Sequence, residues 1–253
     1  MRSSDTILSD RGVNKDLMYW RDRVSKYGEG SVKNLDTEKS KYDEKLRDIA
    51  FFKAVKLKKG MKVLDVGAGV GDWCIKYAKL GCDVTGIDIV DSLSKMARDK
   101  ANKYALNIQF KTSSIEDHDA PAEHYDLITG ICVFQHITGE RELKRSISNI
   151  SRMTKRNGRV AILEYAPRKL SGREPYSDYM EIRTRAEWIK IFEGSGFKLV
   201  GERGVRVLGF KLYNSFKNKP IWSISLLIDR ILCSLRFISN RYSDSRLFIF
   251  KKV

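Results

Sequence analysis

Three glycines at alternate positions, Gly67, Gly69 and Gly71, follow a short apolar run that contains Asp65. Glycine allows positive φ and leaves no Cβ between the backbone and a ligand. A helical pattern resumes two residues later, so unpaired N–H groups at its start would face the glycine turn. About 20 residues on, Asp88 ends a second apolar run, where nucleotide-binding βαβ units place a carboxylate that binds ribose hydroxyls. The pattern predicts a nucleoside site.

The glycine spacing separates two classes of nucleotide site. The dinucleotide fingerprint G-x-G-x-x-G requires glycine at position 72, where this chain has Asp72. An acidic residue followed by G-x-G-x-G after the first strand instead resembles the first motif of the class I S-adenosylmethionine (SAM) methyltransferases. The resemblance implies SAM as the cofactor, with its ribose on Asp88. The alternative for the glycines alone is a tight turn in another doubly wound domain.

Two further strand ends carry the same resemblance. Family members often place Asp or Asn at the position of Ser114, so adenine recognition here would rest on backbone groups and on apolar contact with Ile115. After the fourth strand, Gly130 and Ile131 would line the methionine end and the methyl group. The cofactor-binding residues that the resemblance implies are Asp65, Gly67, Ala68, Gly69, Gly71, Asp88, Ile89, Ser114, Ile115, Gly130 and Ile131.

The candidate catalytic groups are His136, after the fourth strand, and Glu164, at the end of the fifth. The methyl group of SAM is already activated, so the enzyme mainly aligns the acceptor, which can supply ~7–11 kcal/mol. A hydroxyl acceptor also needs a base, and histidine is the usual choice. A structural role for His136 in the following turn is the alternative. No His/Cys/Asp cluster has metal-ligand spacing, and we predict no metal site.

The elements that must position these residues alternate along the chain. Strands are predicted at 62–66, 83–89, 108–111, 125–130 and 159–165, and helices at 73–80, 93–104 and 140–153. This alternation predicts a parallel sheet covered on both faces, with ligands at the carboxyl ends of the strands. Strands at 197–202 and 246–250 would form an antiparallel pair. The predicted fold class is α/β, a doubly wound, mostly parallel seven-stranded sheet with an antiparallel last strand.

Two segments flank the predicted cleft. Residues 17–27 have helical apolar spacing, and such methyltransferases commonly close the pocket with an N-terminal helical lid. Its aromatics would wall the substrate site or pack on the core, and a second helix covers 41–55. Residues 166–177 correspond to the loop over the acceptor in the family, and Thr184 with Glu187 resembles a capping box. The candidate substrate contacts are Tyr19, Trp20, Tyr165, Arg168, Arg173 and Tyr176.

Residues 203–245 replace a link that is normally short in the family. Residues 220–237 read as a helix with two apolar faces, separated by Ser223, Arg230 and Ser234 on one side and by Ser225, Asp229 and Arg236 on the other. One face can pack on the core, which leaves the second without a partner. With basic residues nearby, an anionic membrane surface is one predicted partner. A dimer interface and burial under the N-terminal helix are the alternatives.

Charge and composition bound the remaining choices. The 253 residues carry a formal net charge of +16, yet residues 61–165 are close to neutral, with 15 basic and 14 acidic side chains. Residues 204–253 hold ten basic and two acidic side chains, which would attract an anionic partner. The four cysteines form no C-x-x-C, as in reduced intracellular proteins. With no apolar signal segment or spanning run, we expect a cytoplasmic protein, either free or peripheral on the membrane.

The predicted organisation is an N-terminal helical lid over 1–60, a SAM-binding core over 61–202, and a basic helical insertion with the final strand over 203–253. The expected activity is SAM-dependent methyl transfer to a hydroxyl or carboxyl of a small molecule, such as a sugar or a glycolipid at the membrane surface. RNA methylation and a non-catalytic SAM-binding partner subunit are the alternatives. The chain is expected to be a monomer or a homodimer.

Overall fold

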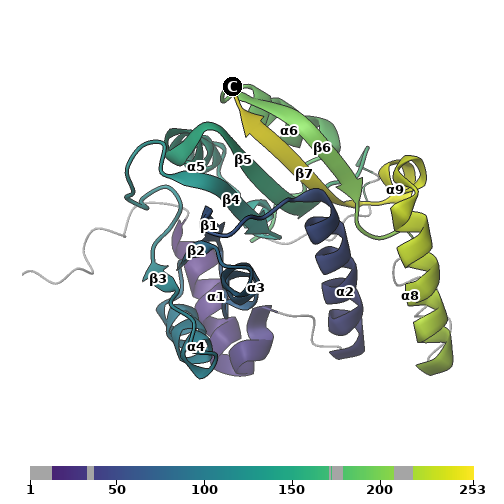
Figure 1. The fold of residues 1–253 in the computed structure, drawn as a ribbon, viewed down its shortest axis with the longest axis horizontal. Coiled ribbons are helices and arrows are strands. Elements are labelled where there is room, and N and C mark those ends of the chain that lie inside the picture. Colours follow the sequence, from purple (N-terminus) through teal and green to yellow (C-terminus); the bar gives the residue numbers. More distant parts are fainter. Residues whose placement is uncertain (1–12, 33–36, 171, 173–178, 208–218) are drawn as a thin grey trace, which may run out of the picture.

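The computed structural model describes residues 13–32, 37–170, 172, 179–207 and 219–253. Within these ranges seven strands form one sheet in the order β3-β2-β1-β4-β5-β7-β6 (Figure 1). The strands are β1 (Lys62–Val66), β2 (Asp83–Asp88), β3 (Gln109–Thr112), β4 (Tyr125–Ile131), β5 (Thr154–Tyr165), β6 (Phe197–Gly204) and β7 (Ser245–Lys252). β7 runs antiparallel to both of its neighbours, whereas the other pairs are parallel. The predicted fold class is confirmed.

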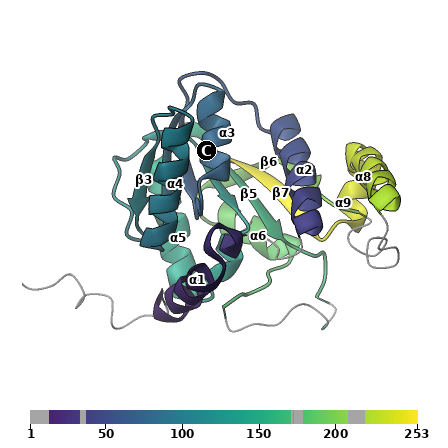
Figure 2. The same cartoon turned by 90° about the horizontal axis from the view of Figure 1, so that it is seen from below.

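Helices cover both faces of the sheet. They are α1 (Val13–Tyr27), α2 (Thr37–Ala54), α3 (Asp72–Lys79), α4 (Asp91–Lys103), α5 (Glu140–Met153), α6 (Arg185–Glu193), α8 (Lys219–Ser234) and α9 (Arg236–Tyr242), with short 3-10 turns η2 (Gly28–Val32) and η3 (Phe134–His136). Buried residues of α2, α3 and α4 share one apolar cluster, and those of α5 and α6 share the other. Figure 2 shows α1 outside these layers, across the open end of the strands.

The central strands are mostly apolar because their side chains meet one or the other of the two helical layers. On β5, Ala161 and Leu163 belong to the cluster under α2 and α3, and Val160 and Ile162 belong to the cluster under α5 and α6. Successive side chains of a strand point to opposite faces, so a sheet covered on both sides needs apolar residues without alternation. This pattern explains why the sequence predicts the central strands so closely.

The observed boundaries of the core elements differ most from the predicted ones at α2 and β5, and by one or two residues at several others. The predicted helix over 41–55 begins at Thr37, and the strand predicted over 159–165 begins at Thr154. The additional residues at the start of each element are mostly polar, so the spacing of apolar residues does not predict them. The predicted capping box is confirmed, because the Thr184 side chain accepts from the Glu187 backbone and the Glu187 carboxylate accepts from the Thr184 N–H.

The prediction of one helix over 220–237 is wrong. The segment forms two helices, α8 and α9, because Leu235 leaves helical geometry with φ −83° and ψ 89°. Ser225 and Asp229 are also not surface separators, since both are buried. The Tyr42 hydroxyl donates to the Asp229 carboxylate, which joins α8 to α2. Within the described ranges, every helix is too short or too polar to cross a membrane.

Candidate functional site

The glycine turn between β1 and α3 takes a conformation that other residues adopt only with strain. Gly67, Gly69 and Gly71 have φ of +65°, +54° and +78°. A Cβ on Gly67 would lie 2.4 Å from Cγ2 of Val133, in the segment after β4. The turn therefore needs glycine both for its backbone angles and for its close approach to the neighbouring strand end.

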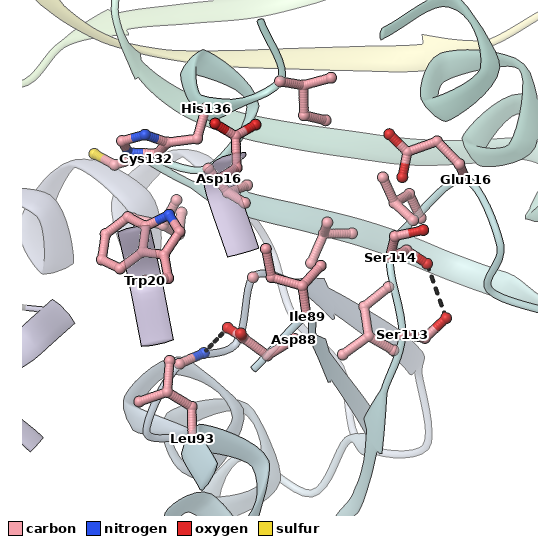
Figure 3. Close-up of a pocket in the computed structure, with 18 of the residues that line it drawn as sticks. Asp16, Trp20, Asp88, Ile89, Leu93, Ser113, Ser114, Glu116, Cys132 and His136 are labelled. Carbon is pink, nitrogen blue, oxygen red and sulfur yellow. Dashed lines mark hydrogen bonds between the residues drawn. The ribbon is translucent and has the colours of Figure 1, made fainter. Parts of the chain in front are cut away.

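Asp88 is fixed beside this turn by backbone donors. Its Oδ2 accepts from the Gly69 N–H at 2.9 Å (Figure 3), and its Oδ1 accepts from the Val90 N–H at 3.0 Å. Burial raises the pKa of the carboxyl, while the backbone N–H groups oppose the rise. The two bonds lock the carboxyl group at the carboxyl end of β2, facing a cavity.

This cavity has a volume of about 310 Å³ and lies at the carboxyl ends of β1, β2, β3 and β4. Figure 3 shows Asp88 and Ile89 on one side, Ser113, Ser114 and Glu116 on a second side, and Cys132, His136 and Trp20 opposite. Among the predicted cofactor and site residues, those that line it are Gly67, Gly69, Asp88, Ile89, Ser114, Ile115, Ile131, His136 and Trp20. Residues of α1 and of the carboxyl ends of four strands therefore converge here.

Several predicted site residues do not line the cavity. Asp65 is buried among β1, β4 and α3, where it accepts from the Thr129 hydroxyl at 2.6 Å and from the Cys74 thiol at 3.4 Å. Burial raises its pKa to about 6. Also outside the lining are Ala68, Gly71, Gly130, Tyr19, Tyr165 and Arg168. Arg173 and Tyr176 lie outside the described residues. Asp65 thus joins three elements under the turn rather than facing the cavity.

His136 lines the cavity in a defined orientation. Its Nδ1 lies 2.9 Å from the Tyr179 carbonyl, an acceptor, so Nδ1 carries the proton and Nε2 keeps its lone pair. The Gln135 amide nitrogen lies 3.4 Å from Nε2. Burial lowers the pKa of the imidazole, which keeps it neutral at neutral pH. A neutral imidazole with a basic Nε2 is the form required of a general base.

Glu164 does not line the cavity. Its Oε1 accepts from the N–H groups of Val133 and Phe134, at 3.1 and 2.9 Å, at the start of the η3 turn that carries His136. Burial raises the pKa of this carboxyl to about 8, against the opposing effect of those backbone donors. The side chain holds the turn in place rather than facing an acceptor.

The N-terminal helix is attached to the site by aromatic contacts. The Trp20 ring meets the edge of the His136 imidazole at 5.1 Å, and Tyr19 stacks on Tyr179 at 3.6 Å between ring centroids. Leu17 and Val24 of the same helix pack with Leu93 of α4. The helix therefore contributes Trp20 to the wall of the cavity and packs its apolar side chains against α4.

Sequence reasoning missed several side chains that line the cavity, chiefly Asp16, Arg47, Glu116, Cys132 and Glu142. Burial, and second the charge of Glu116, raise the pKa of Asp16 to about 6. Cys132 has a φ of +58°, an uncommon backbone conformation for a residue with a Cβ. Nothing in the pattern distinguishes Arg47 from the other basic residues of α2, since only the packing of that helix brings it to the cavity.

The donor set of the cavity fits SAM. Apolar Ile89, Leu93 and Ile115 offer a surface for an adenine ring, and Asp88 offers a carboxylate for ribose hydroxyls. Gly67 and Gly69 leave backbone accessible beside them. Arg47 is a cation for a carboxylate. The ribose and the carboxylate of the cofactor thus each have a complementary group in one cavity.

The chain is similar in sequence to known methyltransferases. A family model described as Methyltransferase domain matches residues 63–158. The ubiquinone biosynthesis O-methyltransferase of Coxiella burnetii is 26% identical over 192 residues, covering 69% of this chain and 77% of the relative. The ubiquinone/menaquinone biosynthesis C-methyltransferase of Shewanella sediminis is 30% identical over 150 residues, covering 57% of this chain and about half of the relative, 53%.

The fold is also similar to that of a solved methyltransferase structure. The magnesium protoporphyrin IX methyltransferase of Synechocystis, with bound SAH, superposes with a TM-score of 0.63 at 19% identity, covering 95% of this chain and 97% of the other. Fold and site together define a SAM-dependent methyltransferase. Residues 63–158 match the methyltransferase domain family, in agreement with the class I, Rossmann-like group that the glycine motif resembles.

Proposed function

We propose that the protein transfers the methyl group of SAM to a hydroxyl of a small molecule, with His136 as the general base. The observation that carries the proposal is the neutral imidazole of His136 in the cavity wall, with Nδ1 held by the Tyr179 carbonyl. The O-methyltransferase among the relatives supports an oxygen acceptor. A carboxyl acceptor, which needs no base, is the second candidate, and a sugar or glycolipid is the acceptor type we favour.

In this proposal the cavity residues divide by chemistry. Asp88 would accept hydrogen bonds from the ribose, Ile89, Ser114 and Ile115 would surround the adenine, and Arg47 would pair with the amino-acid carboxylate. Gly67, Gly69 and Ile131 would lie along the methionine portion. Trp20 and His136 would then border the remaining space, where the acceptor enters.

When bound, SAM would supply a methyl group on a positively charged sulfur. An oxygen lone pair of the acceptor would bond to the methyl carbon, and the sulfur would depart as a neutral thioether. Nε2 of His136 takes the hydroxyl proton as the new C–O bond forms, and the Tyr179 carbonyl stabilises the resulting imidazolium through Nδ1–H. Glu164 fixes the turn that aims the ring. The contribution of such a base is typically 10²–10⁴-fold in rate, about 3–5 kcal/mol.

The charge of the cavity disfavours RNA as the acceptor. Asp16, Asp88, Glu116 and Glu142 line it, against Arg47 as the one cation among its described lining residues. A phosphodiester chain would meet repulsion at that wall, since nucleic-acid sites depend on basic side chains along the backbone. The relatives, named as enzymes, likewise disfavour a non-catalytic SAM-binding subunit.

The test is methyl transfer from labelled SAM to a panel of phenols, sugars and carboxylic acids, with the wild type and His136→Asn. For a hydroxyl acceptor, kcat falls at least 100-fold in the variant while SAM affinity stays within about twofold. The wild-type rate should also show an acid limb with an apparent pKa below the ordinary histidine value of 6.5, absent from the variant. Full activity of His136→Asn on its best acceptor would contradict the role of His136 as general base and favour a carboxyl acceptor.

A further inference from the structure

The outer side of α8 and α9 presents apolar side chains to solvent. We name this surface the α8–α9 face, and it consists of Ile224, Leu227, Ile228, Ile231, Leu235 and Phe237, which are 38% to 78% exposed. Together with Tyr242, these make seven of the fifteen exposed large hydrophobic side chains among the described residues. Single exposed apolar residues are ordinary, but a group concentrated on one short segment marks an interaction site.

The opposite side of α8 is buried and partly polar, which is unusual for the inner side of a surface helix. Ser225 and Asp229 face inward with Leu226 and Cys233. Asp229 accepts from the Tyr42 hydroxyl of α2 and from the Val207 N–H, the latter at 3.0 Å. Buried polar bonds of this kind fix the orientation of the helix. The apolar face is therefore held outward by specific contacts, and Figure 1 shows α8 at the edge of the molecule beside α2.

Three exposed arginines, Arg230, Arg236 and Arg241, lie on the same two helices. With the residues that the structure describes, none of the three forms an ion pair. Arg236 contacts the Glu202 carbonyl at 3.4 Å, and the Arg241 guanidinium lies 5.7 Å from the Tyr242 ring. The acidic residues between positions 224 and 244 are the buried Asp229 and the exposed Asp244. The surface thus combines exposed apolar side chains with excess positive charge.

We propose that the α8–α9 face docks the protein on an anionic lipid membrane. Apolar side chains on one side of a helix, with arginines beside them, match the acyl chains and the negative headgroups of such a surface. A second copy of the chain fits less well, because a two-fold interface brings the same patch of each copy together and would oppose the arginines to one another. The proposal stands independently of the acceptor and of the base.

The test is co-sedimentation of the full chain with vesicles of phosphatidylcholine alone or with one third phosphatidylglycerol. We expect binding to the anionic vesicles that weakens as salt rises, and little binding to the neutral ones. Ile228→Asp/Ile231→Asp should weaken it by roughly two orders of magnitude, since both apolar burial and charge attraction are lost. Arg230→Gln/Arg236→Gln/Arg241→Gln should weaken it at least about tenfold.

The matched control is Leu80→Asp/Tyr104→Asp, which removes two exposed apolar side chains elsewhere on the surface and should bind vesicles as the wild type does. SAM titration of each variant reports the fold and the cofactor site separately from the lipid contact. Failure of the wild type to bind anionic vesicles, or equal binding by the Ile228/Ile231 variant, would overturn the proposal. So would a wild-type dimer in sedimentation velocity that this variant converts to monomer, because the face would then belong to a second copy.

Discussion

The side-chain carboxyl group of Glu164 accepts a hydrogen bond from the backbone N–H of Phe134 at 2.9 Å, so an acidic side chain at the end of β5 holds the turn after β4. Its second oxygen, Oε2, is buried without a hydrogen-bond partner among the described residues. A carboxyl group in such surroundings retains its proton, and burial accordingly raises its pKa to about 8. The strand and the turn are thus coupled through a group that titrates near neutrality.

We expect the free energy of unfolding to fall as pH rises toward 8. Folded Glu164 keeps its proton up to about pH 8, whereas the unfolded chain releases it near 4.5, so between these values the folded state binds more protons. Asp65, with its pKa raised to about 6, acts in the same direction at the lower end of the window. Urea unfolding at pH 5, 6, 7 and 8.5 measures the slope.

Two variants separate the contributions of Glu164 and Asp65 to this pH dependence. Glu164→Gln should flatten it between about pH 6 and 8, because glutamine has no proton to lose, and Asp65→Asn should flatten it below 6. If Glu164→Gln unfolds with the wild-type pH dependence, Glu164 is not the titrating group.

Asp88→Ala should weaken SAM binding by roughly 10–100-fold, since hydrogen bonds to a charged group are worth about 1.5–3 kcal/mol. Calorimetric titration gives the affinity, and thermal unfolding shows whether the glycine turn survives the loss of the Gly69 contact. Asp83→Ala, at the exposed start of the same strand, is the control and should bind as the wild type. Unchanged affinity in the Asp88 variant would place the ribose elsewhere.

Gly67→Ala should destabilise the fold by about 2–4 kcal/mol, because it combines a left-handed backbone with a Cβ 2.4 Å from Val133. Gly60→Ala isolates the backbone cost, since its φ of +81° opens on free space, and about 1 kcal/mol is expected there. Gly67→Ala/Val133→Ala should recover part of the loss in denaturant unfolding. A Gly67 variant no less stable than the Gly60 one would mean that the turn shifts without cost.

The sequence predicted those features that local pattern controls. Apolar runs located β1 and β4, and the glycine spacing located the turn whose positive φ values require glycine. The carboxylate of Asp88 was predicted because its place at a strand end follows from the βαβ unit itself. Helix α5 has the predicted boundaries because its apolar spacing and its ends are both local signals.

Features that depend on tertiary packing were not predictable. Arg47 reaches the cavity only because α2 crosses the sheet at one angle, and Asp16 only because α1 lies across the strand ends. Asp229 resembles a solvent-facing residue on a helical wheel, yet its partner Tyr42 is 187 residues away in the chain. Glu164 stands at the expected strand end, but its orientation toward the Phe134 backbone depends on the neighbouring turn.

Because β7 lies between β5 and β6, the sheet can be fully paired only after β7 has been synthesised. β5 pairs with β7 along seven residue pairs, so its outer edge stays open while roughly eighty residues of later chain are made. A nascent chain that has paired β1 to β5 therefore carries an exposed edge of β5 until β7 leaves the ribosome. Shortening that strand would leave two open edges at once, and aggregation would be the expected failure.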